Sequence, residues 1–121
     1  MADPTMKILL IDDDPDAVAL RRLIFEAQGY HVSTATDAPT ARALFGQNPD
    51  VVVTDLRLPD AADGLALIRD FRAASPGVRI VVLCGWPADL DGRPERAMID
   101  VLLAKPVRSQ ALLSKILPEG V

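Results

Sequence analysis

Three carboxylates and one lysine are the side chains of this sequence whose types and positions could do chemistry. Each stands at the end of a short apolar run: Asp12 and Asp13 after 7–11, Asp55 at the end of 51–55, and Lys105 after 101–104. Such runs are typical of buried parallel strands, and open α/β sheets bind their ligands at strand ends. We therefore expect Asp12, Asp13 and Asp55 to meet at one edge of a sheet.

The predicted cluster indicates a site for a cation and a phosphoryl group. Three carboxylates in one crevice repel one another, so they require protons or a bound cation. A hard divalent ion such as Mg²⁺ relieves the repulsion and leaves positions open for water or phosphate oxygens. Lys105 adds a positive charge on a long side chain. The set predicts Asp55 as the nucleophile of a Mg²⁺-dependent phosphoryl transfer, with Asp12 and Asp13 beside the metal.

The elements that must position these residues alternate along the chain. Five runs predict strands, at 7–11, 31–35, 51–55, 79–84 and 101–104. Helical patterns lie between them, so right-handed crossovers require a parallel sheet covered on both faces. The predicted fold is α/β, a flavodoxin-like (βα)5 three-layer sandwich with the strand order 2-1-3-4-5.

The sequence signals for helices are less regular than those for strands. Asp14-Pro15 predicts a helix start, with Ala17, Leu20, Ile24 and Ala27 on the buried face, and Asp37 predicts a second cap. A loop is expected over 56–63, followed by Gly64 and a helical stretch. Pro87, Gly92 and Pro94 predict a short or irregular fourth helix. Ser109 is expected to cap a last helix that carries Leu112, Leu113, Ile116 and Leu117.

Composition limits the class of protein. The 121 residues are enough for one domain, predicted over 1–121 with its core at about 6–117. A net charge of −4 argues against direct binding to nucleic acid or an anionic membrane. Cys84 is the single cysteine, which excludes an internal disulfide and indicates a reducing compartment. Without a signal peptide or an apolar span, the expected location is the cytoplasm.

The motifs together resemble a known family. They are Ile8-Leu9-Leu10-Ile11-Asp12-Asp13-Asp14-Pro15, Val53-Thr54-Asp55-Leu56-Arg57-Leu58-Pro59 and Ala104-Lys105-Pro106. In combination they resemble the receiver domain of two-component response regulators. The resemblance implies a signalling module rather than an enzyme, in which Asp55 accepts phosphate from a histidine kinase or a histidine phosphotransfer protein with Mg²⁺. It also implies metal ligation by the backbone carbonyl of Arg57, pairing of Lys105 with phosphate, and a cis Lys105–Pro106 peptide.

Several positions depart from the family pattern, and the loop after Asp55 is one residue longer than is common, because Asp63-Gly64 falls one place late. Cys84 stands where receivers carry Thr or Ser, and a thiol is a weaker hydrogen-bond donor than a hydroxyl. Leu102 stands where the family usually has Tyr or Phe. The groups that usually report phosphorylation are therefore missing, which predicts an atypical switch region and output partner.

Two bulky residues flank the expected line along which water would attack an acyl phosphate. Arg57 comes two residues after Asp55, and Trp86 comes two residues after Cys84. Both are expected to exclude water and to slow loss of the phosphate.

Two other interpretations fit the residues. A degenerate receiver would bind a partner constitutively, which Cys84 and Leu102 would permit. A haloacid-dehalogenase-like phosphatase would use the Asp-x-Asp within Asp12-Asp13-Asp14; it ranks last, because the chain has no room for a cap domain. The receiver itself is expected to be a free-standing regulator or a domain excised from a hybrid kinase.

Overall fold

A single five-stranded sheet forms the centre of the molecule. In the computed structural model, residues 6–116 are described. The strands are β1 (Lys7–Ile11), β2 (His31–Ala35), β3 (Val51–Asp55), β4 (Arg79–Cys84) and β5 (Val101–Ala104). All pairs are parallel, and the order is β2-β1-β3-β4-β5. The predicted flavodoxin-like fold and strand order are confirmed.

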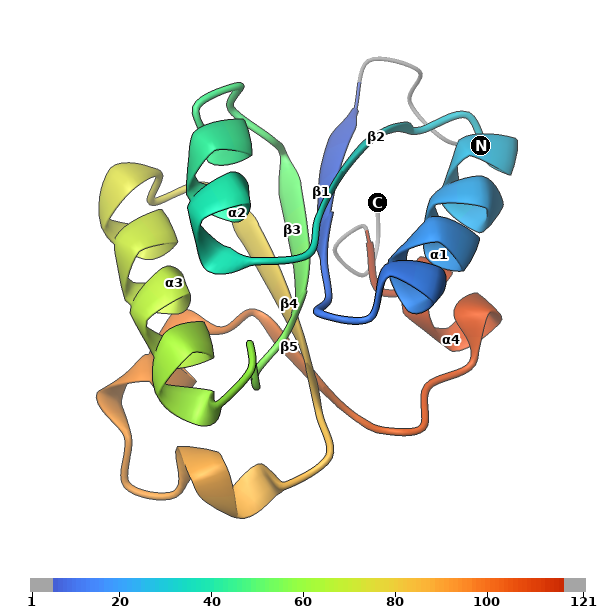
Figure 1. The fold of residues 1–121 in the computed structure, drawn as a ribbon. Coiled ribbons are helices and arrows are strands. Elements are labelled where there is room, and N and C mark those ends of the chain that lie inside the picture. The colour runs from blue at the N-terminus through green and yellow to red at the C-terminus, as the bar shows by residue number, and fades with distance from the viewer. Residues whose placement is uncertain (1–5, 117–121) are drawn as a thin grey trace.

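Helices cover both faces of this sheet, which gives three layers. The α-helices are α1 (Pro15–Ala27), α2 (Ala38–Phe45), α3 (Ala61–Ala74) and α4 (Ser109–Leu113). In Figure 1, α2 and α3 lie on one side of the strands, and α1 and α4 lie on the other. Between β4 and β5, two short 3-10 helices, η1 (Pro87–Leu90) and η2 (Pro94–Met98), replace an α-helix. The prediction of a short or irregular fourth helix is confirmed.

Side chains from successive strand residues enter two separate cores. On β1, Leu9 packs with residues of α2 and α3, whereas Ile8 packs with Val18 and Phe25 of α1. This separation follows from the alternation of side chains along a strand. All five residues of β3 are buried, which is why its sequence is apolar almost throughout.

Aspartates cap three of the helices. The Asp14 side chain accepts hydrogen bonds from the backbone N–H groups of Asp16 and Ala17, and Asp37 accepts one from Thr40. Asp60 caps α3, so the helix begins at Ala61 and the predicted loop over 56–63 is too long. At α4 the cap position is Arg108, without a side-chain cap hydrogen bond. The prediction that Ser109 caps this helix is therefore wrong, and Leu117 lies outside the described residues.

The buried face of α1 differs from the predicted one. Val18 and Phe25, two turns apart, are its buried residues. Leu20 instead is 60% exposed. The helix is rotated so that its large aromatic residue fills the core, whereas the predicted stripe, which contained two alanines, offered less apolar area.

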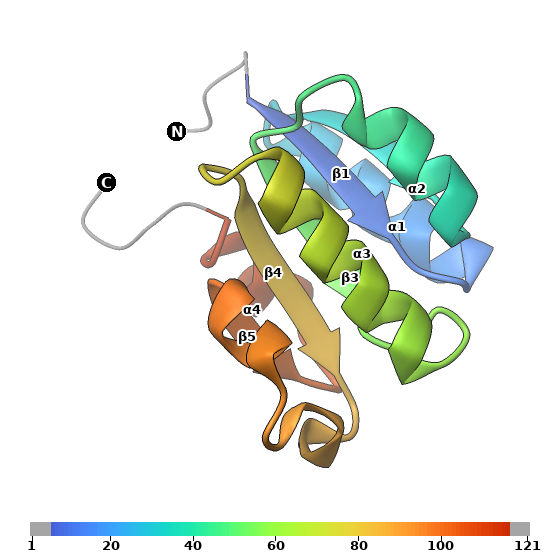
Figure 2. The same cartoon turned by 90° about the vertical axis from the view of Figure 1, so that its left-hand side faces the viewer.

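Arg72 fastens the irregular segment between β4 and β5 to α3. Its guanidinium donates to the carbonyl oxygens of Pro76, Val78 and Met98, and it pairs with Asp100 Oδ2 at 2.7 Å. Asp100 Oδ2 also accepts from the backbone N–H of Ile80 at 2.8 Å. Figure 2 shows this segment, in orange, alongside β4. Hydrogen bonds to one arginine thus replace the regular packing that an α-helix would provide.

The start of α3 approaches the backbone after β3 very closely. A Cβ atom added at Gly64 would lie 1.6 Å from the carbonyl oxygen of Leu56. Glycine is therefore the residue that this contact admits. The contact fixes α3 against the chain that leaves Asp55.

No helix within residues 6–116 is long and apolar enough to cross a membrane.

Candidate functional site

Strand register brings the acidic residues to one level. Ile11 of β1 is paired with Thr54 of β3, so the next residues, Asp12 and Asp55, end the two strands side by side. Ligand oxygens of Asp12, Asp13 and Asp55 lie within 4.8 Å of one another. Asp12 and Asp55 are buried, whereas Asp13 is exposed. The crevice at this strand edge thus brings the three predicted carboxylates together.

Lys105 reaches the crevice from the far side of β4. Its backbone N–H donates to the carbonyl of Cys84 at 3.0 Å, which extends the β4–β5 ladder by one residue. Its Nζ lies 2.9 Å from Asp55 Oδ1. This contact is an ion pair without hydrogen-bond alignment, because Asp55 Oδ1 has no hydrogen-bond partner among residues 6–116. A buried carboxylate oxygen without such a partner is available to an incoming group.

Burial and charge set the electrostatics of the crevice. The pKa of Asp55 is raised to about 6: desolvation by burial is the main cause, Lys105 opposes the shift, and the neighbouring Asp12 adds to it. Burial also acts to raise the pKa of Asp12. Hydrogen bonds from the backbone of Asp14, from Asp55 and from Arg21 outweigh it, so the pKa of Asp12 is lowered. Burial thus penalises the charge on Asp55, whereas hydrogen bonds and the Arg21 guanidinium favour the charge on Asp12.

Arg21 is part of the crevice, although sequence analysis missed it. Its Nη1 lies 2.8 Å from Asp12 Oδ2, and Asp12 Oδ1 accepts from the backbone N–H of Asp14 at 2.9 Å. The spacing of Asp14, Ala17 and Arg21 places them on one side of α1, and all three line the cleft. The sequence signal that could have identified Arg21 was this helical spacing of residues after the acidic end of a strand.

An open cleft of about 610 Å³ lies over these residues. Its lining includes Asp12, Asp13, Asp55 and Lys105. Carboxylate oxygens around an open volume are ligands that Mg²⁺ or Ca²⁺ prefers, and Asp55 Oδ1 has no hydrogen-bond partner among residues 6–116 that would compete with a metal ion. The residues present therefore fit a hard divalent cation.

A second cavity, of about 180 Å³, lies on the other side of Asp55. Arg57, Cys84, Trp86 and Asp89 line it together with Asp55 and Lys105. The predicted water-excluding residues Arg57 and Trp86 thus share one pocket with Asp55. Cys84 is buried, while Trp86 is 65% exposed.

Arg57 and Asp89 form a two-pronged ion pair at the rim of this pocket. Arg57 Nε lies 2.9 Å from Asp89 Oδ2, and Nη2 lies 3.1 Å from Oδ1. The Arg57 Cζ atom also lies 5.9 Å from the ring centre of Trp86, within cation–π range. The hydrogen bonds to Asp89 raise the pKa of Arg57. Asp89 belongs to a segment without regular periodicity, and no sequence signal marked it.

The remaining predicted positions lie as follows. The Lys105–Pro106 peptide bond is cis, and Leu58–Pro59 is also cis. Leu102 is partly buried against the core beneath α2 and α3.

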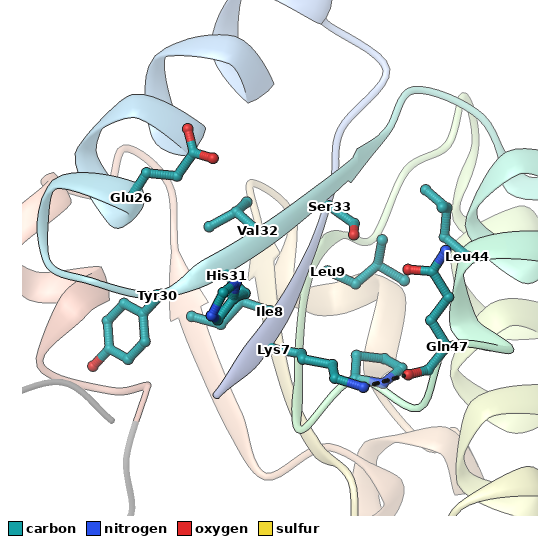
Figure 3. Close-up of a pocket in the computed structure, with 11 residues that line it drawn as sticks. Lys7, Ile8, Leu9, Glu26, Tyr30, His31, Val32, Ser33, Leu44 and Gln47 are labelled. Carbon is teal, nitrogen blue, oxygen red and sulfur yellow. Dashed lines mark hydrogen bonds between the residues drawn. The ribbon is translucent and has the colours of Figure 1, made fainter. Parts of the chain in front are cut away.

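A third cavity, of about 540 Å³, surrounds the amino-terminal end of β2. Figure 3 shows Glu26 and Tyr30 on one side of this strand and Leu44 and Gln47 on the other. Lys7 Nζ donates to the Gln47 carbonyl at 3.2 Å across it. The carboxylate crevice lies at the opposite ends of the strands, so this cavity takes no part in the site.

Known proteins match this chain over most of its length. The family model described as the response regulator receiver domain matches residues 8–117. The transcriptional regulatory protein GlrR of Escherichia coli is 32% identical over 119 residues, which are 96% of this chain and 26% of GlrR. The chain therefore spans about a quarter of that relative.

The solved structures that are similar in fold include two with 28% sequence identity to this chain. A CheY-like receiver domain protein from Methanospirillum hungatei has a TM-score of 0.81 and 28% identity, covering 93% of this chain and 90% of that one. A response regulator protein from Burkholderia pseudomallei, solved with a phosphorylated aspartic acid, calcium ion and citrate, has a TM-score of 0.80 and 28% identity. Coverage is 93% of this chain and 66% of that one.

The doubly wound sheet with acidic residues at the ends of β1 and β3 and a lysine after β5 defines a signalling domain of the phosphoacceptor type. The chain belongs to the receiver domain family of two-component response regulators.

Proposed function

We propose that Asp55 is the phosphoacceptor of this receiver domain in a two-component phosphorelay. The observation that carries the proposal is the state of its carboxylate. Asp55 is buried, its Oδ1 lacks a hydrogen-bond partner among the described residues, and an ammonium and two further carboxylates surround it. A carboxylate in this setting is a nucleophile placed where charge can be neutralised.

The transfer proposed is an exchange of one bond to phosphorus for another. A carboxylate oxygen of Asp55 attacks the phosphorus of a phosphohistidine, and the P–N bond breaks as the O–P bond forms. The electron pair of the broken bond stays on the imidazole nitrogen, which takes a proton from solvent. Lys105 then moves its pairing from Asp55 Oδ1 to the phosphoryl oxygens. Asp12, Asp13, Asp55 and the Arg57 backbone carbonyl would hold Mg²⁺, which supplies positive charge to the phosphoryl oxygens.

Phosphorylation in this chain serves signal transduction rather than turnover. About two negative charges added at the end of β3 bias the neighbouring loops and so change partner binding. The upstream partner is a histidine kinase or a histidine phosphotransfer protein, in the cytoplasm, and the downstream partner is a protein. GlrR is a transcriptional regulatory protein, so any contact with DNA belongs to segments other than this acidic domain, which we propose spans 1–121.

The alternative interpretations gain no support from the site. The phosphatase interpretation needs a free Asp-x-Asp, but the Asp14 carboxylate is engaged as the cap of α1. The degenerate interpretation needs a damaged phosphoacceptor site, whereas Asp12, Asp13, Asp55 and Lys105 are gathered in one crevice.

Labelled acetyl phosphate tests the proposal. Wild type should acquire Mg²⁺-dependent label that mass spectrometry maps to Asp55. Asp55→Asn should remain unlabelled, and Asp70→Asn, an exposed carboxylate paired with Arg42, should label like wild type. Label that survives in Asp55→Asn, or that is absent from wild type with Mg²⁺, would refute the assignment.

A further inference from the structure

One ion pair joins the two loops that border the smaller cavity beside Asp55. Arg57 belongs to the loop between β3 and α3, and Asp89 belongs to η1, which follows β4. Both guanidinium-to-carboxylate contacts are short, at 2.9 and 3.1 Å, and their fork geometry is the one that arginine offers to carboxylates and phosphates alike. Asp89 therefore binds the Arg57 guanidinium with the same two-pronged geometry that a phosphoryl group would use.

Arg57 and Asp55 border the same volume. The cavity of about 180 Å³ is lined by both residues, and Lys105, which is ion-paired with Asp55, lines it as well. A phosphoryl group on Asp55 carries about two negative charges, against one on Asp89. The Arg57 side chain is 51% accessible, so surrounding side chains do not enclose it and it has room to turn from one partner to the other. Once Asp55 carries a phosphoryl group, its larger negative charge favours pairing of the Arg57 guanidinium with this group over pairing with Asp89.

The usual hydroxyl readout is absent at this position of the chain. Cys84 lines the same cavity, and its thiol donates hydrogen bonds only weakly. Arg57 also lines this cavity, and its positively charged guanidinium can donate the hydrogen bond to a phosphoryl oxygen that the thiol donates only weakly.

We propose that Asp89 is a positioning residue that holds Arg57 while Asp55 is unmodified, and that phosphorylation transfers the Arg57 guanidinium from Asp89 to the phosphoryl oxygens. This inference rests on the proposed phosphoacceptor role of Asp55. When the Arg57 guanidinium leaves Asp89, the ion pair that joins η1 to the β3–α3 loop is broken. The exchange thus converts a charge on Asp55 into a movement of the segment 87–90.

Linkage fixes the size of the expected effect. If phosphoryl binding breaks the Arg57–Asp89 pair, then the pair must weaken phosphoryl binding by the same factor. Exposed ion pairs of this kind correspond to about a two- to fivefold change in an equilibrium constant. Asp89→Asn should therefore tighten the binding of a phosphoryl analogue by about that factor.

Beryllofluoride with Mg²⁺ is the probe, because its binding is an equilibrium. The Kd of beryllofluoride should fall about two- to fivefold in Asp89→Asn relative to wild type. Asp91→Asn removes the same charge nearby, and its Kd should equal that of wild type. In an Arg57→Gln background, Asp89→Asn should have no further effect, which separates the exchange from general repulsion by Asp89.

The side-chain Nε–H signal of Arg57 in nitrogen-15 NMR gives a direct readout. In wild type it should shift when beryllofluoride binds. In Asp89→Asn it should differ from wild type before binding and coincide with it afterwards. An unmoved Arg57 signal on binding, or an unchanged Kd in Asp89→Asn, overturns the exchange but leaves Asp55 as phosphoacceptor. Absence of any Mg²⁺-dependent phosphorylation of Asp55 by acetyl phosphate overturns both.

Discussion

Lys105 Nζ lies 2.9 Å from Asp55 Oδ1, although the two residues leave the ends of strands that are separated by β4. The side chain of Lys105 spans this strand to reach the carboxylate. The pair is asymmetric in exposure, because the lysine side chain is 41% accessible and that of Asp55 is 4%. The lysine is thus the partner with room to change its position when a group is added to Asp55, whereas Asp55 is enclosed by its neighbours.

The buried carboxylate of Asp55 makes the stability of the metal-free protein depend on pH. Its pKa stands at about 6, above the ordinary value of 3.8. Stabilisation by the protonated form is therefore fully present below pH 3.8 and is lost as the pH rises through about 6. Asp55→Asn removes the ionisable group. At pH 7 in EDTA the variant should be more stable by roughly 1 kcal/mol, after allowance for solvent near Lys105, or about 4 °C in Tm.

Thermal unfolding across pH values checks this dependence. The difference in Tm between Asp55→Asn and wild type should disappear at about pH 4 and below, where both side chains are neutral. Asp70→Asn, with an exposed carboxylate, provides the control. A lower Tm for Asp55→Asn than for wild type at pH 7 would contradict the assignment of burial as the main cause.

Bulk around the smaller cavity should set the lifetime of the acyl phosphate. Arg57 and Trp86 both line this cavity beside Asp55. The double variant Arg57→Asn, Trp86→Ala should release phosphate several-fold faster than wild type, because water gains access to the phosphorus. A phosphate-release assay on phosphorylated protein measures this rate. Leu20→Ala, exposed on α1, is the control, and equal lifetimes in wild type and the double variant would end the hypothesis.

Arg21 competes with a cation for Asp12. Its Nη1 lies 2.8 Å from Asp12 Oδ2. Arg21→Gln should lower the Kd for Mg²⁺ about two- to fivefold, because the pair no longer has to be broken. Isothermal titration calorimetry gives the Kd. Arg22→Gln, which removes an exposed arginine paired with Glu26, should leave it unchanged, and weaker Mg²⁺ binding by Arg21→Gln would contradict the competition.

Gly64 should tolerate no side chain. A methyl group there would overlap the Leu56 carbonyl, so Gly64→Ala should cost at least about 3 kcal/mol in the free energy of unfolding, through overpacking and backbone displacement. Gly77 faces open space, and Gly77→Ala should change that energy by less than about 1 kcal/mol. Urea unfolding measures both. Similar stabilities for the two variants would contradict the prediction, because they would show that the start of α3 can move away from the Leu56 carbonyl at little cost.

Arg72 should be the most important arginine for the stability of the irregular segment. It satisfies three backbone carbonyls and the Asp100 carboxylate, so Arg72→Ala should cost about 2–3 kcal/mol. Arg42→Ala breaks only an exposed pair with Asp70 and should cost less than about 1 kcal/mol. Hydrogen exchange should also become faster in residues 94–100 of Arg72→Ala. Equal effects of the two variants on unfolding would contradict this role.

The strands could be predicted from sequence because their signal is local and redundant. Each of the five predicted runs has the bounds of a strand. The apolar runs of β1, β3 and β4 are almost completely buried, as expected for central parallel strands, whereas the edge strands β2 and β5 are partly exposed. The convergence of Asp12, Asp13 and Asp55 followed from topology, since strand ends share one edge.

Other features depend on tertiary contacts that no local pattern contains. The rotation of α1 that buries Phe25 and exposes Leu20 was decided by core volume. Arg21 lies at the site because one face of α1 is turned toward Asp12. Asp89 lies at the site because the irregular segment after β4 places it beside Arg57. Charged residues of that kind are common on surfaces, and only the fold distinguishes these two.

Asp55 lies between two cavities with different linings. The open cleft of about 610 Å³ has the acidic residues and Arg21, and the pocket of about 180 Å³ has Arg57, Trp86 and Asp89. Only Asp55 and Lys105 line both volumes, so every other lining residue borders Asp55 from one cavity alone. A substitution of such a residue changes the shape and charge of one cavity and leaves the lining of the other as it is.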